Sequence, residues 1–107
     1  MEKEKQKEII NTTVKVIKDS INIREVLGDF GMSPESDIVS SLSSMEEGII
    51  QLAEEALGPE WRQWLYWFIY ENSCGEREYE VTVGYGKETF RVKTVDDIIR
   101  AVEHTLH

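Results

Sequence analysis

The sequence lacks the features that mark several protein classes. It has one cysteine, Cys74, in 107 residues, so no disulfide can form within the chain and a reducing compartment is expected. The longest apolar run, Trp64 to Tyr70, is much shorter than the ~20 residues that cross a bilayer. The charged start, Met1 to Lys5, leads into no apolar stretch of the kind a secretion signal needs. We therefore expect a cytoplasmic protein with a single domain over residues 1–107.

Basic residues are missing from the middle of the chain. The net charge is −9, from 12 basic and 21 acidic residues. Residues 31–60 hold seven of the acids and no lysine or arginine. Such a charge repels nucleic acid and anionic membrane surfaces, so neither is expected as a direct partner. The acidity favours a basic protein surface instead.

Residue types that carry chemistry do not form a catalytic or metal-binding pattern. Cys74 follows a predicted helix, and the negative end of a helix disfavours a thiolate. His104 and His107 lack the further ligands that a zinc site needs. Gly84-Tyr85-Gly86 is too short for a phosphate-binding glycine loop. We expect no cofactor, no metal and no enzymatic activity.

Apolar residues recur at helical spacing through the first two thirds of the chain. The pattern predicts a helix over residues 4–19 and a short second helix over 22–30. Ser33 and Pro34 indicate the start of a third helix, which Gly58-Pro59 ends. A fourth, over 60–72, is apolar on almost every side, which is typical of a helix in a core or against a partner. The predicted inner faces are Ile10, Val14, Ile17 and Ile21 in the first helix, and Ile38, Leu42, Met45, Ile49, Leu52 and Ala56 in the third.

The spacing then changes to that of a β-hairpin and a last helix. Tyr79, Val81 and Val83 alternate with polar residues, and a glycine-containing turn leads to a second strand that holds Phe90 and Val92. Thr94 can begin a final helix, whose apolar residues are Ile98, Ile99, Val102 and Leu106. The order predicts an α+β fold with three or four N-terminal helices, a two-stranded antiparallel hairpin and a C-terminal helix.

The third predicted helix separates apolar residues from acidic ones. Its glutamates fall opposite the predicted inner face, so they form an anionic surface that no base neutralises. A solvated face without a partner explains the same pattern, and the tryptophans that follow suit either a core or a binding hot spot. The residues predicted to contact a partner are Asp37, Glu46, Glu47, Glu54, Glu55, Trp61 and Trp64.

The aromatic segment resembles part of a group of small proteins from phages and prophages. Residues 61–75 read WRQWLYWFIYENSCG, similar to the pattern W-x-x-W-x-x-Y/W-F-I-Y-E-x-x-F-G of those proteins, with Cys74 in place of the phenylalanine. In them a hairpin and a final helix follow, as predicted here. The resemblance implies a mobile-element origin and a place in the host cytoplasm. By analogy with anti-CRISPR proteins, it implies an inhibitor that mimics nucleic acid and binds a basic, nucleic-acid-handling host protein.

Two other functions fit the sequence. The aromatic helix would serve as the interface of a homo-oligomer in a structural module. A small-molecule site would lie between this helix and the hairpin, lined by Tyr66, Tyr70 and Tyr79.

Overall fold

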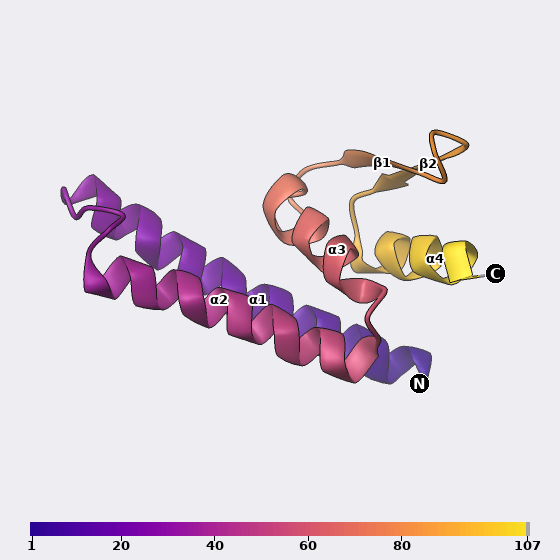
Figure 1. Cartoon of the computed structure of the whole chain (residues 1–107), viewed down its shortest axis with the longest axis horizontal. Coiled ribbons are helices and arrows are strands. Elements are labelled where there is room, and N and C mark those ends of the chain that lie inside the picture. The colour runs from indigo at the N-terminus through magenta and orange to yellow at the C-terminus, as the bar shows by residue number, and fades with distance from the viewer. Residues whose placement is uncertain (107) are drawn as a thin grey trace.

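Two long helices form an antiparallel hairpin that runs the length of the molecule (Figure 1). The computed structural model describes residues 1–106. Helix α1 spans Lys3–Asp29 and α2 spans Asp37–Leu57. The remaining elements pack over the open end of the hairpin, where the chain starts, whereas its closed end projects freely. The molecule is therefore elongated, with a longest dimension of 46 Å.

Helix α1 is one continuous helix rather than the two that the sequence predicts. Its predicted inner face is confirmed, because Ile10, Val14 and Ile17 are buried. The predicted break before residue 22 does not occur, and Gly28 lies within the helix despite its low helix propensity. Packing of α1 against α2 outweighs that local preference.

The start of α2 lies three residues later than predicted. Ser36 is the capping residue, and its Oγ accepts a hydrogen bond from the Val39 N–H at 3.4 Å. The predicted cap, Ser33, instead begins a turn in which its carbonyl accepts from the Ser36 N–H at 3.0 Å. Pro34 occupies the second position of that turn, where its fixed φ is favourable.

The aromatic segment forms a short α-helix that widens into a π-helical turn. Helix α3 spans Trp61–Tyr66 and the π-turn η1 spans Trp67–Glu71. Asn72 follows, fully buried, and its Nδ2 donates to the carbonyl oxygens of Arg77 and Val92 at 3.0 and 2.5 Å. This amide therefore joins the end of the aromatic segment to the strands.

The β-hairpin agrees with the prediction. Strand β1 spans Tyr79–Val83 and β2 spans Glu88–Val92, in antiparallel register with Val81 opposite Phe90. On the exposed side, Arg91 lies 3.3 Å from Glu80 and 3.9 Å from Glu78, so opposite charges face each other across the two strands.

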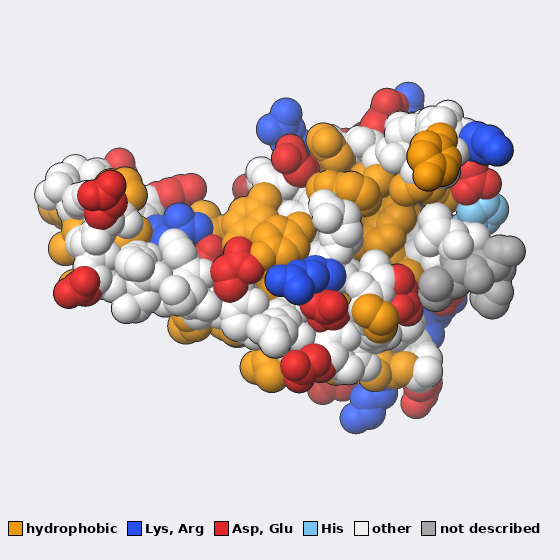
Figure 2. Space-filling view, viewed as in Figure 1, with side chains coloured by type: hydrophobic (Ala, Val, Ile, Leu, Met, Phe, Trp, Pro, Cys, Tyr) orange, Lys and Arg blue, Asp and Glu red, His pale blue; other side chains and the backbone are white. Residues whose placement is uncertain are grey.

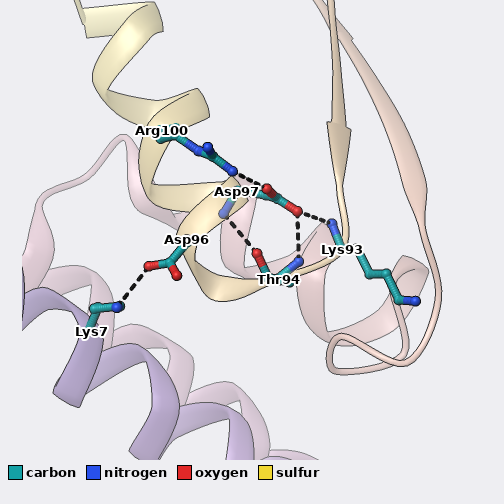
Figure 3. Close-up of polar contacts among 6 residues, drawn as sticks. All are labelled: Lys7, Lys93, Thr94, Asp96, Asp97 and Arg100. Carbon is teal, nitrogen blue, oxygen red and sulfur yellow. Dashed lines mark hydrogen bonds and ion pairs between the residues drawn. The ribbon is translucent and has the colours of Figure 1, made fainter.

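Helix α4, Val95–Leu106, begins at a reciprocal cap (Figure 3). The Thr94 Oγ1 accepts from the Asp97 N–H at 3.1 Å, and an Asp97 carboxylate oxygen accepts from the Lys93 and Thr94 N–H groups, each at 3.0 Å. Asp96, next to this cap, forms a 2.9 Å ion pair with Lys7 of α1. The predicted start at Thr94 is confirmed, whereas the side chain of Leu106 lies outside the described residues.

The core lies where α3, η1 and α4 meet α1 and the inner side of the β-hairpin. Ile98, Ile99 and Val102 of α4 are buried there, as predicted. The helices and the two-stranded sheet make the fold α+β, in agreement with the sequence. Within residues 1–106, no helix combines the length and apolar character needed to span a membrane.

Candidate interaction surface

Glu46, placed by the sequence at the centre of an exposed anionic surface, is buried instead. It is 1 % exposed, and it bridges the two long helices. Arg24 of α1 donates to both of its carboxylate oxygens, from Nε at 2.7 Å and from Nη2 at 2.8 Å. The Ser20 hydroxyl donates at 2.8 Å and the Tyr70 hydroxyl at 3.3 Å. The prediction that Glu46 contacts a partner is wrong, because its hydrogen-bonding capacity is used within the fold.

The surroundings of Glu46 determine its charge state. Burial acts to raise the pKa of this carboxyl, but the hydrogen bonds from Arg24 and Ser20 outweigh it, so the pKa lies below its ordinary value. Burial and the negative charge of Glu46 raise the pKa of Tyr70. The carboxylate is therefore ionised and the phenol neutral at neutral pH, which suits the hydrogen bond between them.

Two further predicted acids contact neighbours in the C-terminal half of the chain. Glu47 accepts a hydrogen bond from the Tyr66 hydroxyl, and Glu54 lies 3.6 Å from Arg62. The sequence could not place Arg62 there, because that contact depends on how α3 folds back beside α2. These contacts neutralise or occupy part of the predicted anionic surface.

Asp37 and Glu55 remain exposed, as predicted. Among residues 1–106 neither forms an ion pair. They lie near opposite ends of α2, about 27 Å apart at 1.5 Å per residue. In the view of Figure 2 the acidic side chains are scattered among neutral and apolar ones rather than gathered into one patch.

Trp61 and Trp64 are core residues. They are 1 % and 7 % exposed, and Trp64 packs edge-on against Trp67 and Phe90. An oligomer interface or a hot spot on these two side chains would require the core to open, so that part of the prediction is wrong. The alternative of core packing, also open from the sequence, is confirmed.

The inner face of α2 is turned by one residue from its predicted position. The buried residues are Val39, Glu46, Ile50 and Ala53, about 100° around the helix from the predicted set. The apolar stripe of α2 is wider than the part of it that is buried within this chain. Periodicity locates such a stripe but does not tell which of its edges faces the core.

The unused edge forms an exposed apolar surface together with α1. Ile9, Val16 and Ile23 follow one another at steps of seven on α1, and so do Ile38, Met45 and Leu52 on α2. All except the half-buried Ile9 are between 40 and 66 % exposed. We call these six residues the apolar hairpin face. In Figure 2 hydrophobic side chains are visible along the lower border of the hairpin, away from the C-terminal elements.

A groove brings one residue of each set together at the open end of the hairpin. It has a volume of about 400 Å³ and is lined by Ile9, Thr12, Ile49 and Leu52, among others. At the closed end of the hairpin, Phe30 is also 86 % exposed. Large apolar side chains that gather on one side of a monomer are a feature of interaction sites.

The tyrosines predicted to line a small-molecule site are not brought together as expected. Tyr66 and Tyr70 lie side by side, with ring centroids 5.7 Å apart, and their hydroxyls point to α2. The cavity that Tyr70 lines contains Lys18 and Cys74 and includes neither Tyr66 nor Tyr79.

The other reactive residue types have structural surroundings. Burial raises the pKa of the Cys74 thiol, which opposes formation of a nucleophilic thiolate. His104 lies 3.2 Å from Glu88, whereas His107 lies outside the described residues. Within residues 1–106, histidine, cysteine and acidic side chains form no cluster suited to a metal ion.

Comparison with known proteins finds no matching family model, no matching curated protein and no matching solved structure.

Proposed function

We propose that this chain is a non-catalytic interaction module that binds protein through the apolar hairpin face. The observation that carries the proposal is the heptad spacing of exposed Val, Ile, Met and Leu side chains on two adjacent antiparallel helices. Side chains at this spacing are those that pack into the surface of another helix. The partner is therefore expected to offer apolar helical surface.

The proposal keeps the predicted class of a binding protein but moves the binding surface. Nucleic-acid mimicry needs closely spaced, exposed anions, and the structure buries Glu46 against Arg24 and pairs Glu54 with Arg62. The anionic surface that motivated a phosphate-groove ligand is therefore smaller and more dispersed than predicted. Inhibition of a host protein stays a prediction, which a contact through the apolar hairpin face would also serve.

Photocrosslinking tests the proposal. A photoreactive amino acid is placed at Met45, at the centre of the face, and in a matched control at Lys87, in the turn between β1 and β2. In cells that produce the protein, we expect a protein crosslinked at position 45 and not at 87. The same products from both positions, or none from position 45, would refute the proposal.

A further inference from the structure

The apolar hairpin face is arranged in levels. Ile9 and Leu52 line one groove near the open end of the hairpin, so they lie close together on the two antiparallel helices. A step of seven forward in α1 and seven back in α2 pairs Val16 with Met45. A second step pairs Ile23 with Ile38. Each step is about 10 Å along the helices, so three apolar pairs follow one another at even intervals.

We propose that a second copy of this chain covers this face and completes a four-helix assembly. The inference rests on the proposed function and names its partner. A half-turn about an axis parallel to the helices places α1 of one copy over α2 of the other. All neighbouring helices are then antiparallel, and each level meets the same level of the second copy. The match needs no adjustment of register, because both copies carry the same heptad.

Small residues on α2 allow the second copy to approach closely. Ser41 and Gly48 lie on the outer side of the face, one heptad apart, and Gly48 is one turn from both Met45 and Leu52. A Cβ atom at Gly48 would meet nothing within 4 Å, so the chain's own packing does not require glycine there. Glycine inside a helix lowers its stability. A helix backbone approaching from outside accounts for its presence.

The size and edge charges of the face suit a dimer. The 21 residues of α2 span about 31 Å. Two helix widths of about 10 Å each then give a footprint of roughly 600 Å² per copy, near the ~800 Å² per partner of a standard stable interface. Lys5 and Glu8 line the groove beside Ile9, and Glu55 lies one turn from Leu52 at the same end of the face. The half-turn therefore brings Lys5 of one copy near Glu55 of the other, with Glu8 beside them.

The net charge of −9 opposes association of two copies. Screening by salt reduces this repulsion but leaves apolar contacts in place. The dimer is therefore expected to tighten as the salt concentration rises, opposite to a complex with a basic protein.

Sedimentation equilibrium of the purified full chain tests the inference. The wild type should approach twice its mass of 12.4 kDa as concentration rises. Met45→Glu should weaken the dimer on the order of a hundredfold, because the two-fold interface would bury two unpaired carboxylates. Tyr85→Glu, the same change on a fully exposed turn residue, should leave the mass unchanged. Gly48→Leu should weaken the dimer while its circular dichroism stays helical.

The outcomes separate the two proposals. A wild type that stays monomeric at all concentrations and salt levels would refute the proposal that a second copy covers the face. So would a dimer that Met45→Glu and Tyr85→Glu affect equally. If the chain is monomeric but position 45 crosslinks to a different protein, the proposed function holds and the second copy is rejected. If position 45 gives no crosslink and the chain is monomeric, both proposals fail.

Discussion

The ion pair between Arg24 and Glu46 gives the sharpest prediction about stability. Arg24→Met keeps most of the apolar stem but leaves the Glu46 carboxylate buried with only two hydroxyl donors. Breaking a buried pair in this way costs about 3–5 kcal/mol. A domain of this size is stable by only about 5–15 kcal/mol. The variant should therefore lose a large part of its stability, and its Tm should fall on the order of 15 °C.

A double variant shows whether the charge or the packing is responsible. Replacing both partners, with Arg24→Met and Glu46→Leu, removes the unpaired carboxylate, so stability should return to within about 1–2 kcal/mol of the wild type or exceed it. Lys15→Met is the matched control, since Lys15 is exposed on the same helix. It should change stability by less than about 0.5 kcal/mol.

Urea unfolding followed by tryptophan fluorescence measures these differences, because Trp61 and Trp64 are buried. A loss below about 1 kcal/mol for Arg24→Met would refute the reasoning, as would a double variant no more stable than the single one. The effects of the two substitutions on the free energy of unfolding should therefore be non-additive.

The same pair fixes the direction of the pH dependence. The folded pKa of Glu46 lies below its ordinary value of 4.5. Its contribution is therefore fully present above about pH 4.5 and is lost as the pH falls through the lower folded value. In Arg24→Met, burial without the guanidinium raises that pKa, so protonation stabilises the variant. The stability gap between wild type and variant should narrow below pH 5; a constant gap contradicts the assignment.

Three further predictions concern the C-terminal elements. Asp97→Ala removes the carboxylate half of the reciprocal cap of α4 and should cost about 1 kcal/mol in thermal unfolding; since hydrogen bonds from the Thr94 and Lys93 backbone lower the pKa of Asp97, the loss should vanish in acid. Gly75→Ala should cost about 1–3 kcal/mol, because Gly75 has φ +89° and an added Cβ would lie 3.2 Å from the Lys93 carbonyl oxygen; a neutral result would contradict that backbone. Cys74 should react with iodoacetamide at neutral pH at least about tenfold slower in the folded than in the urea-unfolded chain, because burial raises its pKa.

The secondary structure followed from the sequence where local signals agreed. Alternation and a glycine turn predicted β1 and β2, and Thr94 with its acidic neighbours predicted the start of α4. The π-turn η1 carries no such signal, because its residues are all compatible with an ordinary helix. Gly28 is a misleading signal, since α1 continues through it to Asp29.

The sequence pattern does not tell which residues of α2 are exposed. The pattern of α2 has one broad apolar stripe, and the prediction directed all of it inward. The periodicity places Glu46 opposite the predicted inner face, and its partner Arg24, which allows a carboxylate to be buried, lies 22 residues away on another helix. The heptad of Ile9, Val16 and Ile23 was a usable signal for the exposed edge, and it was not recognised.

The bond between Arg24 and Glu46 also limits how the two long helices can change in length. Sliding α1 by one turn relative to α2 would move the guanidinium about 5.4 Å from its carboxylate. Both charges would then lack a partner. An insertion or deletion in one helix between the ion pair and the connecting turn is therefore tolerated only with an equal change in the other. Variation in the length of this hairpin is expected in matched steps of seven residues, which preserve both the pair and the heptad phase of Ile38 relative to Met45.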